Sequence, residues 1–243
     1  MLGFGMTDKG LIRSENQDTY LFEYFEDRDI ALCIVCDGMG GVRGGGMASH
    51  IASTCFVSHI RTCLSSKVKK ELPAILMEAA DYANQKVYRR SRLDSSCRGM
   101  GTTLVGALIC GSEIMIINIG DSRGYLISGK NIKQITRDHS LVEDMVRRGE
   151  LSATEAKFHP RKNLITRALG VDIKVKCDIF THNFKIGDYL LLCSDGLTNQ
   201  VADEEILSIV SGEKDLEIIC KRLLDLTLMR GAPDNVTVVI LEL

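Results

Sequence analysis

Apolar positions along the chain follow two periodicities, one typical of strands and one typical of helices. Short apolar or alternating runs predict strands near 2–7, 18–25, 29–36, 102–110, 113–119, 123–128, 176–182, 188–193 and 235–242. Apolar residues at three- and four-residue spacing predict helices near 46–65, 72–93, 140–148, 203–210 and 214–229. Pro73 lies near the first turn of the second helix, where proline is favoured.

The order of these elements indicates the fold class. Helices come in pairs between groups of strands instead of following every strand, which disfavours a doubly wound parallel sheet. Antiparallel sheets packed together with helices outside, a layered α+β fold, suit this order better. We expect residues 1–243 to form one domain. The least regular stretch, 149–175, contains "FHPRKNLITRALG" and is predicted to be a mobile flap.

Composition and charge narrow the class of protein. The chain is 45% apolar and 26% charged, which is typical of a soluble globular protein. Its formal net charge is −2, and basic residues do not alternate with aromatic ones, so nucleic acid is not an expected partner. The apolar runs are too short for a membrane span, and the N-terminus does not have the layout of a signal peptide. We therefore expect a cytoplasmic protein without a membrane partner.

The nine cysteines are interpreted as free thiols in a reducing compartment. Cys33 and Cys36 form the CxxC pair, but in a strand they point to opposite faces and cannot easily bind one metal ion. Cys55 and Arg61 match the C-x5-R pattern of cysteine phosphatases, yet "CFVSHIR" has the pattern of an amphipathic helix. The glycine-rich "GMGGVRGGGMAS" follows a strand as phosphate loops do, but it matches neither common nucleotide motif in register.

Aspartates stand at the ends of several predicted strands. Asp-Gly after an apolar run is consistent with a hairpin turn, and taken singly each site has that interpretation. Carboxylates crowded at the edge of a core are costly unless they are paired or bind a cation. Oxygen donors suit Mg²⁺ or Mn²⁺ and not a zinc site, and two such ions can activate water and brace a phosphoryl group. The aspartates at these strand ends, and therefore the candidate metal ligands, are Asp18, Asp37, Asp121, Asp195 and Asp234.

Arg13 is the candidate phosphate ligand. It lies five residues before Asp18 in "TDKGLIRSENQD", across a turn that carries Ser14 and Asn16. A guanidinium group binds phosphate oxygens in a bidentate manner. A surface arginine without a function remains the alternative interpretation.

Eight segments in this order resemble the metal-dependent serine/threonine protein phosphatases of the PPM (type 2C) family, in their compact bacterial form. They are "TDKGLIRSENQD", "CDGMGG", "GMGTTLVGAL", "NIGDSRGYLI", "TRDHSLV", "NLITRALG", "GDYLLLCSDGLT" and "APDNVTVVIL". The resemblance extends from about residue 3 to residue 241. It implies a four-layer α-β-β-α sandwich, in which two central antiparallel sheets are flanked by helices and the metal cleft lies at one edge.

The resemblance also implies roles for individual residues. Asp37 bridges two ions, Mn²⁺ or Mg²⁺, and the carbonyl of Gly38 completes the second. Asp195 and Asp234 bind the first ion, and Asp18 orients water at the centre. Asp121 helps to bind a weaker third ion. Arg13 binds the substrate phosphate, and a water that bridges the ions attacks phosphorus directly, without a phosphoenzyme.

The implied substrates are phosphorylated proteins, and the implied activity opposes a serine/threonine kinase. We expect a monomer in which Arg161 and Lys162 of the flap bind substrate. The chain departs from the family pattern where it has Gln17, Val42 and Gly46, at positions that often hold Glu, His and Glu. A general acid is therefore not identified, and His139 and His159 are candidates. These departures keep open a catalytically silent relative that binds phosphoproteins or senses a signal.

Overall fold

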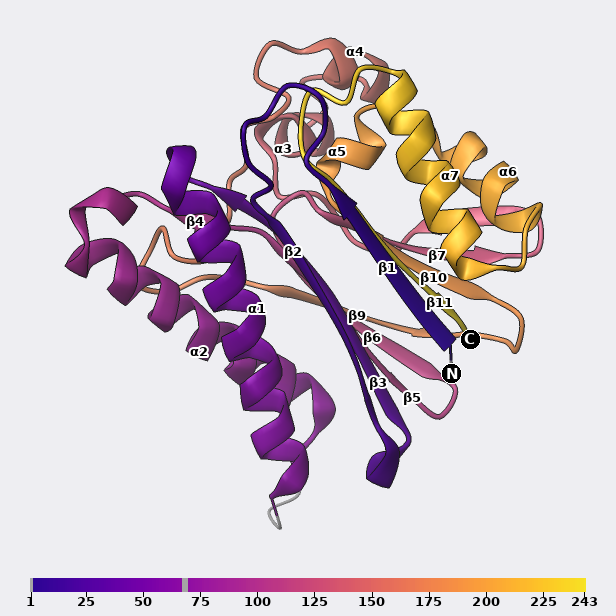
Figure 1. The fold of residues 1–243 in the computed structure, drawn as a ribbon, viewed down its shortest axis with the longest axis horizontal. Coiled ribbons are helices and arrows are strands. Elements are labelled where there is room, and N and C mark those ends of the chain that lie inside the picture. Colours follow the sequence, from indigo (N-terminus) through magenta and orange to yellow (C-terminus); the bar gives the residue numbers. More distant parts are fainter. Residues whose placement is uncertain (1, 67–69) are drawn as a thin grey trace.

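Two antiparallel sheets form the centre of the molecule (Figure 1). The computed structural model describes residues 2–66 and 70–243, with the side chains of residues 41–43 outside that description. The strands of one sheet lie in the order β1-β11-β10-β7-β8, and those of the other in the order β2-β3-β5-β6-β9, with β4 paired to β3. Both sheets contain strands from the two halves of the sequence, so the predicted single domain is consistent with the topology.

The strands agree closely with the apolar runs of the sequence. The first sheet contains β1 (Leu2–Asp8), β7 (Arg123–Ser128), β8 (Asn131–Gln134), β10 (Tyr189–Cys193) and β11 (Val236–Glu242). The second contains β2 (Asp18–Phe25), β3 (Ile30–Met39), β5 (Leu104–Cys110), β6 (Glu113–Ile119) and β9 (Asp178–Asn183), joined by the short β4 (Gly101–Thr102). Strand β8 was not predicted, because its four residues, "NIKQ", lack a buried apolar face.

The five predicted helices are all present, and the start of the first is the one large departure from the predicted bounds. They are α1 (Gly41–Ser65), α2 (Leu72–Leu93), α3 (Leu141–Arg147), α6 (Asp203–Ser211) and α7 (Leu216–Met229). The structure adds α4 (Ala153–Phe158), α5 (Asp195–Thr198) and two 3₁₀ turns, Glu26–Arg28 and Ser95–Cys97. Helix α4 begins with a capping box between Ser152 and Glu155, a signal in "SATE" that the prediction of an irregular stretch did not use.

The predicted start of the first helix was wrong by one turn and a half. Helix α1 begins at Gly41, not near residue 46, although it then contains Gly44, Gly45 and Gly46. Glycine disfavours helix interiors by about 1 kcal/mol, which is why the pattern placed the start later. Close packing requires glycine here, because a Cβ at Gly45 would collide with the side chain of Gln17. The glycines allow the first turn to pack closely against the strand ends.

Three apolar layers separate the four layers of secondary structure. Helices α1 and α2 cover the outer face of the six-stranded sheet through Phe56, Ile60 and Leu76, among others. Helices α5, α6 and α7 cover the outer face of the other sheet. Between the sheets, alternate residues of β3 and β5 meet Leu190 and Leu192 of β10. This arrangement is the predicted α-β-β-α sandwich.

Other expectations from the sequence can be placed on this fold. Cys33 points into the layer between the sheets and Cys36 into the layer under α1, and all nine cysteines are free. Cys55 and Arg61 lie within α1, where Arg61 pairs with Glu23 at 2.9 Å, so they do not form a phosphate loop. Within the residues that the structure describes, no helix has the length and apolar character that crossing a membrane requires.

Candidate metal centre

The aspartates from separate strands meet at one edge of the sandwich. Asp18 opens β2 and is directly opposite Asp37, near the end of the neighbouring antiparallel strand β3. Asp195 follows β10 as the first residue of α5, and Asp234 immediately precedes the residues that lead into β11. Asp121 follows β6. Neither Asp-Gly pair forms a hairpin turn: Asp37-Gly38 lies within β3 and Asp195-Gly196 begins a helix.

A cleft of about 390 Å³ lies between these strand ends. It is lined by most of the residues that the sequence singled out, together with Gln17, Thr103 and Asn163. The predicted site residues in its lining are Arg13, Asp37, Gly38, Asp121, Asp195 and Asp234. Asp18 lies beneath the cleft with 8% of its surface exposed. Arg161 and Lys162 do not line the cleft, although their neighbours Asn163 and Ile165 do.

Asp18 is fixed by hydroxyl groups of the opposite sheet. Ser194 Oγ and Thr237 Oγ1 donate hydrogen bonds of 2.8 and 2.7 Å to its Oδ2 atom. Its Oδ1 atom is buried and has no hydrogen-bond partner among the described residues. A buried carboxylate oxygen without a partner is costly, so this atom is suited to an additional ligand such as a water molecule at a cation.

The electrostatics of the cleft favour bound cations. Burial raises the pKa of Asp18 to about 7 and that of Asp121 to about 8, and Asp195 contributes to both shifts. Burial and then the charge of Asp18 raise the pKa of Asp37 well above its ordinary value, and the pKa of Asp195 is raised by burial and by Asp234. Protons or cations must therefore neutralise these groups. The donors are oxygens, which fit Mg²⁺ or Mn²⁺.

Two threonines that the sequence analysis did not single out hold Asp37 in place. The N–H group of Asp37 donates to Thr103 Oγ1 at 2.9 Å. Its carbonyl accepts from Thr102 Oγ1 at 2.8 Å and from the N–H group of Thr103 at 2.9 Å. These bonds fix the backbone on both sides of the Asp37 side chain. The two threonines lie in the "GTT" of "GMGTTLVGAL". This segment contributed to the family resemblance but did not indicate that its hydroxyl groups hold Asp37.

Gly38 occupies a position without room for a side chain. A Cβ atom there would collide with the carbonyl group of Gly45 at the start of α1. Its N–H group donates to the carbonyl of Gln17 at 3.2 Å, and the N–H group of Gln17 donates to Asn235 Oδ1 at 2.8 Å. Asn235 thus connects the segment before β2 to the segment before β11, a function that its place next to Asp234 did not reveal.

Arg13 reaches the cleft from the loop between β1 and β2. Its Nη2 atom donates a 2.7 Å hydrogen bond to Asp234 Oδ2, and this bond is the main reason why the pKa of Arg13 is raised. The side chain remains 55% exposed. A second arginine, Arg123, forms a 2.7 Å ion pair with Asp138 and does not line the cleft. Arg13 is therefore placed at the mouth of the cleft, beside the carboxylates and accessible to solvent.

Neither candidate histidine lines the cleft. His139 is buried, and its Nδ1 atom accepts a 3.0 Å hydrogen bond from the N–H group of Gly120. Its Nε2 atom lies 3.1 Å from Asp178, and burial lowers its pKa. His159 ends α4 and accepts from the N–H group of Arg161. Gly46 lies in the first turns of α1, while the side chain of Val42 lies outside the described residues.

Lys162 connects the irregular stretch to the cleft indirectly. Its Nζ atom lies 3.4 Å from Asn199 Oδ1, and Asn199 Nδ2 donates to Asp195 Oδ2 at 2.9 Å. The stretch is also bound to the body of the protein at its end, where Leu169 and Thr102 exchange two backbone hydrogen bonds of 2.8 and 3.1 Å. Arg161 is exposed at the surface.

Comparisons with known proteins agree with this geometry. The family model described as "Protein phosphatase 2C" matches residues 13–221. The serine/threonine phosphatase stp of Listeria monocytogenes is 39% identical over 237 residues, which cover 97% of this chain and 93% of that protein. The crystal structure of serine/threonine phosphatase Stp1 from Staphylococcus aureus is similar with a TM-score of 0.92 and 34% identity, covering 99% of this chain and 94% of that chain.

A further solved structure contains metal ions. The catalytic domain of the serine/threonine protein phosphatase PstP, in complex with two manganese ions, is similar with a TM-score of 0.84 and 32% identity, covering 98% of this chain and 96% of that chain. The family match covers most of the sequence, and the likeness extends through both sheets and their helices. This chain belongs to the protein phosphatase 2C (PPM) family of metal-dependent serine/threonine protein phosphatases.

Proposed function

We propose that the carboxylate cleft is the phosphatase active site and that it hydrolyses phosphoserine and phosphothreonine in proteins. The observation that carries this proposal is the convergence of four carboxylates on one cleft, with the exposed guanidinium of Arg13 at its mouth. The carboxylates suit cations and repel an anion, whereas Arg13 attracts one. A phosphate monoester and divalent ions together satisfy both sides.

The chain offers a donor set for two ions, Mn²⁺ or Mg²⁺. In this proposal Asp37 would contribute to both ions, Asp195 and Asp234 would hold one, and the Gly38 carbonyl would hold the other. Asp121 belongs to a weaker third ion. When bound, the ions lower the pKa of water and neutralise charge on the phosphoryl oxygens. The raised pKa values of Asp37, Asp121 and Asp195 are the evidence in this chain that the cleft suits positive charge.

The other residues act by binding and orientation. Arg13 binds two oxygens of the substrate phosphate and holds the monoester against the carboxylate side of the cleft. Asp18 is held through Oδ2, and its Oδ1 atom would accept a hydrogen bond from a water molecule in the centre. Thr102 and Thr103 keep Asp37 in position. A protein nucleophile is not required, and direct attack by water is consistent with this set of residues.

Substrate recognition extends beyond the cleft. We infer that Arg161 and Lys162 contact residues flanking the phosphorylated side chain, because Lys162 is connected through Asn199 to Asp195. The proposed substrates are cytoplasmic proteins phosphorylated by a serine/threonine kinase, and the enzyme acts as a monomer. The catalytically silent alternative gains no support, since every aspartate that it would be expected to lack is present.

Hydrolysis of p-nitrophenyl phosphate and of a phosphothreonine peptide tests the proposal. We expect activity with Mn²⁺, loss of activity with EDTA, and recovery when Mn²⁺ is restored in excess. Asp37→Asn and Asp195→Asn should abolish activity while retaining the circular dichroism spectrum of the wild type. Asp144→Asn, a change in a surface ion pair with Arg147, is the matched control. Activity that survives EDTA would refute the metal assignment.

A further inference from the structure

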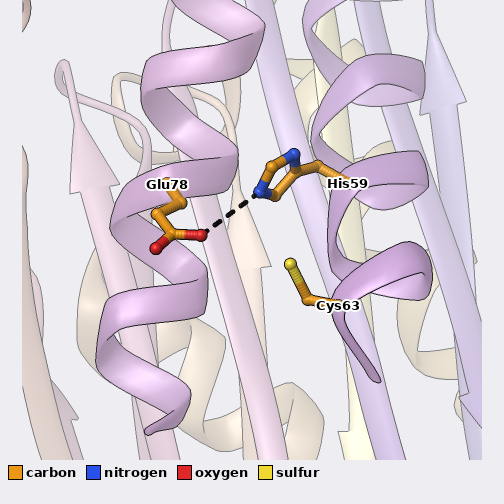
Figure 2. A group of neighbouring side chains, drawn as sticks. All are labelled: His59, Cys63 and Glu78. Atoms are coloured by element: carbon orange, nitrogen blue, oxygen red, sulfur yellow. Dashed lines mark ion pairs between the residues drawn. The ribbon is translucent and has the colours of Figure 1, made fainter. Parts of the chain in front are cut away.

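A second group of metal-ligating side chains lies between α1 and α2, apart from the carboxylate cleft. His59 and Cys63 are four residues apart on α1 and therefore share one face of the helix. Glu78 faces them from α2 (Figure 2). One ligand atom from each residue, the Cys63 Sγ atom among them, lies within 4.8 Å of the other two. His59 Nε2 and Glu78 Oε2 are 3.7 Å apart.

The imidazole of His59 points a buried nitrogen toward this group. Its Nε2 atom is shielded from solvent and has no hydrogen-bond partner among the described residues. The 3.7 Å separation from Glu78 is too long for a hydrogen bond. The ring of Tyr82 lies against the imidazole with 5.2 Å between ring centroids, which restricts the orientation of the ring. A buried nitrogen that lacks a hydrogen bond and is held in place by neighbouring atoms is suited to bind a metal ion.

The three donors differ in chemistry from those of the cleft. One imidazole nitrogen, one thiol sulfur and one carboxylate oxygen form a set that Zn²⁺ prefers, whereas the oxygen donors of the cleft suit Mg²⁺ or Mn²⁺. Zinc bonds of about 2.0–2.3 Å place tetrahedral ligands about 3.3–3.8 Å apart. The His59–Glu78 separation already lies in this range. A side-chain rotation at Cys63 or Glu78 that moves the ligand atom by about 1 Å would bring all three separations into this range.

We propose that His59, Cys63 and Glu78 bind a Zn²⁺ ion that joins α1 to α2, with water in the fourth position. On binding, the sulfur–hydrogen bond of Cys63 breaks, its proton passes to solvent and a sulfur–zinc bond forms without any change of oxidation state. Neutral His59 contributes the lone pair of Nε2, and Glu78 contributes Oε2. The site is independent of the phosphatase assignment, because none of its residues lines the cleft.

Lys70 competes for the same carboxylate. Its Nζ atom donates to Glu78 Oε1 at 2.9 Å and to Oε2 at 2.6 Å. Zinc binding at Oε2 leaves Oε1 available to Lys70, so the ammonium group weakens zinc binding without preventing it. Removal of the Lys70 charge should therefore tighten zinc binding, whereas removal of the Glu78 charge should weaken it. If these residues form only a surface ion pair, neither change should alter the affinity for zinc.

The position of the site indicates a structural effect and not a catalytic one. Helix α1 begins beside the cleft at Gly41, and at 1.5 Å per residue His59 lies about 27 Å further along the helix. The ion would connect the two helices that cover the outer face of the six-stranded sheet. Zinc should therefore raise the unfolding temperature of the protein and leave hydrolysis in saturating Mg²⁺ unchanged.

Titration of the full-length protein with Co²⁺ tests the proposal. The protein is kept in a non-thiol reductant and saturating Mg²⁺, so that the cleft is occupied. We expect a thiolate-to-cobalt charge-transfer band that saturates at one ion per chain and disappears when Zn²⁺ is added. Cys63→Ser should abolish the band. Cys55→Ser, which changes a half-buried thiol two turns earlier on the same helix, should retain it.

The remaining variants separate ligation from packing. His59→Asn and Glu78→Gln should weaken Zn²⁺ binding by at least about 10–100-fold, the loss known for residues that only support a metal ligand. Lys70→Met should strengthen it. Zn²⁺ should raise the unfolding temperature of wild type and of Cys55→Ser but not of Cys63→Ser. A missing band in wild type, a band that persists in Cys63→Ser, or equal zinc affinity in Glu78→Gln and wild type would overturn the proposal.

Discussion

Arg13 and Asp234 form a 2.7 Å ion pair at the mouth of the cleft, although they are 221 residues apart in the sequence. The proposed phosphate ligand is thus bound to a proposed metal ligand. Divalent ions bound in the cleft would neutralise Asp234 and weaken this pair, which would leave the guanidinium available to phosphate. The cleft can in this way couple occupation by metal to binding of substrate.

Arg13→Ala should lower kcat/KM for a phosphothreonine peptide by roughly 10–100-fold. A charge-assisted hydrogen bond contributes about 1.5–3 kcal/mol, and this variant loses the bidentate contact with phosphate. Steady-state kinetics in saturating Mn²⁺ measure the effect, and Arg13→Lys should recover only part of it because an ammonium group is not bidentate. Unchanged kinetics in Arg13→Ala would mean that Arg13 is a surface residue that does not bind the substrate phosphate.

Thr237→Val should raise the Mn²⁺ concentration required for half-maximal activity. The change removes the 2.7 Å hydrogen bond that fixes Asp18 Oδ2, while it conserves the shape of the side chain. Thr7→Val is the matched control, because Thr7 contacts the Thr237 hydroxyl at 2.6 Å without contacting Asp18. We expect a shift of roughly tenfold in Thr237→Val, on the basis of about 1.5 kcal/mol for a hydrogen bond to a charged group. Equal shifts in both variants would indicate a packing effect.

The metal-free protein should become less stable as pH rises from about 5 to about 8. The pKa of Asp18 is raised from 3.8 to about 7 and that of Asp121 from 3.8 to about 8, so between these values the folded state binds more protons than the unfolded state. Stability then falls with rising pH, by up to about 1.4 kcal/mol per pH unit for each proton.

Thermal unfolding in EDTA across this pH range measures the slope. Asp18→Asn should reduce it, because an amide does not titrate. Saturating Mn²⁺ should reverse it, since bound cations favour the ionised carboxylates. A metal-free protein whose stability rises with pH over the same range would contradict the raised pKa values.

Gly38→Ala should impair both folding and hydrolysis. The added methyl group collides with the backbone carbonyl of Gly45, which cannot move without shifting the start of α1. Overpacking of this kind costs about 1–3 kcal/mol, and it displaces the proposed Gly38 ligand. Chemical denaturation and activity measurements test both effects.

Gly46→Ala provides the control for that substitution. Among the described residues, and apart from the backbone of α1 itself, the closest atoms to a Cβ at Gly46 are 3.8 Å away, so these atoms leave room for the methyl group. Alanine is also favoured over glycine in a helix by about 1 kcal/mol. We therefore expect Gly46→Ala to be at least as stable as wild type and to remain active.

The sequence predicted most elements because their patterns are local. Period-two runs and helical spacing identified the long strands and helices within a few residues. The errors have specific causes. Helix α1 begins before its predicted start although its first turns contain Gly44, Gly45 and Gly46, and a Cβ at Gly45 would collide with the side chain of Gln17. Strand β8 has a single apolar side chain, Ile132, which gives no repeating pattern, and α4 begins with a capping box within a stretch whose apolar spacing is irregular.

The cleft was predicted in its chemistry but not in its geometry. The motifs indicated which aspartates belong together, and the structure places Asp37, Asp121, Asp195 and Asp234 around one cavity. It separates Asp18, which lies beneath the cavity, and it leaves Arg161 and Lys162 outside the lining. The supporting residues Thr103, Ser194 and Asn235 were not predicted, because a hydroxyl or amide beside a motif residue gives no sign of its partner.

The sequence by itself determined the elements, their layered class and the oxygen-rich chemistry of the strand ends, since each depends on residues close together in the chain. Only the tertiary structure decided that Ser194 and Asp18, 176 residues apart, share a hydrogen bond, and that Glu78 faces His59 across two helices. Contacts of this kind depend on strand register and on helix packing, which arise from the burial of the whole core and not from any local pattern.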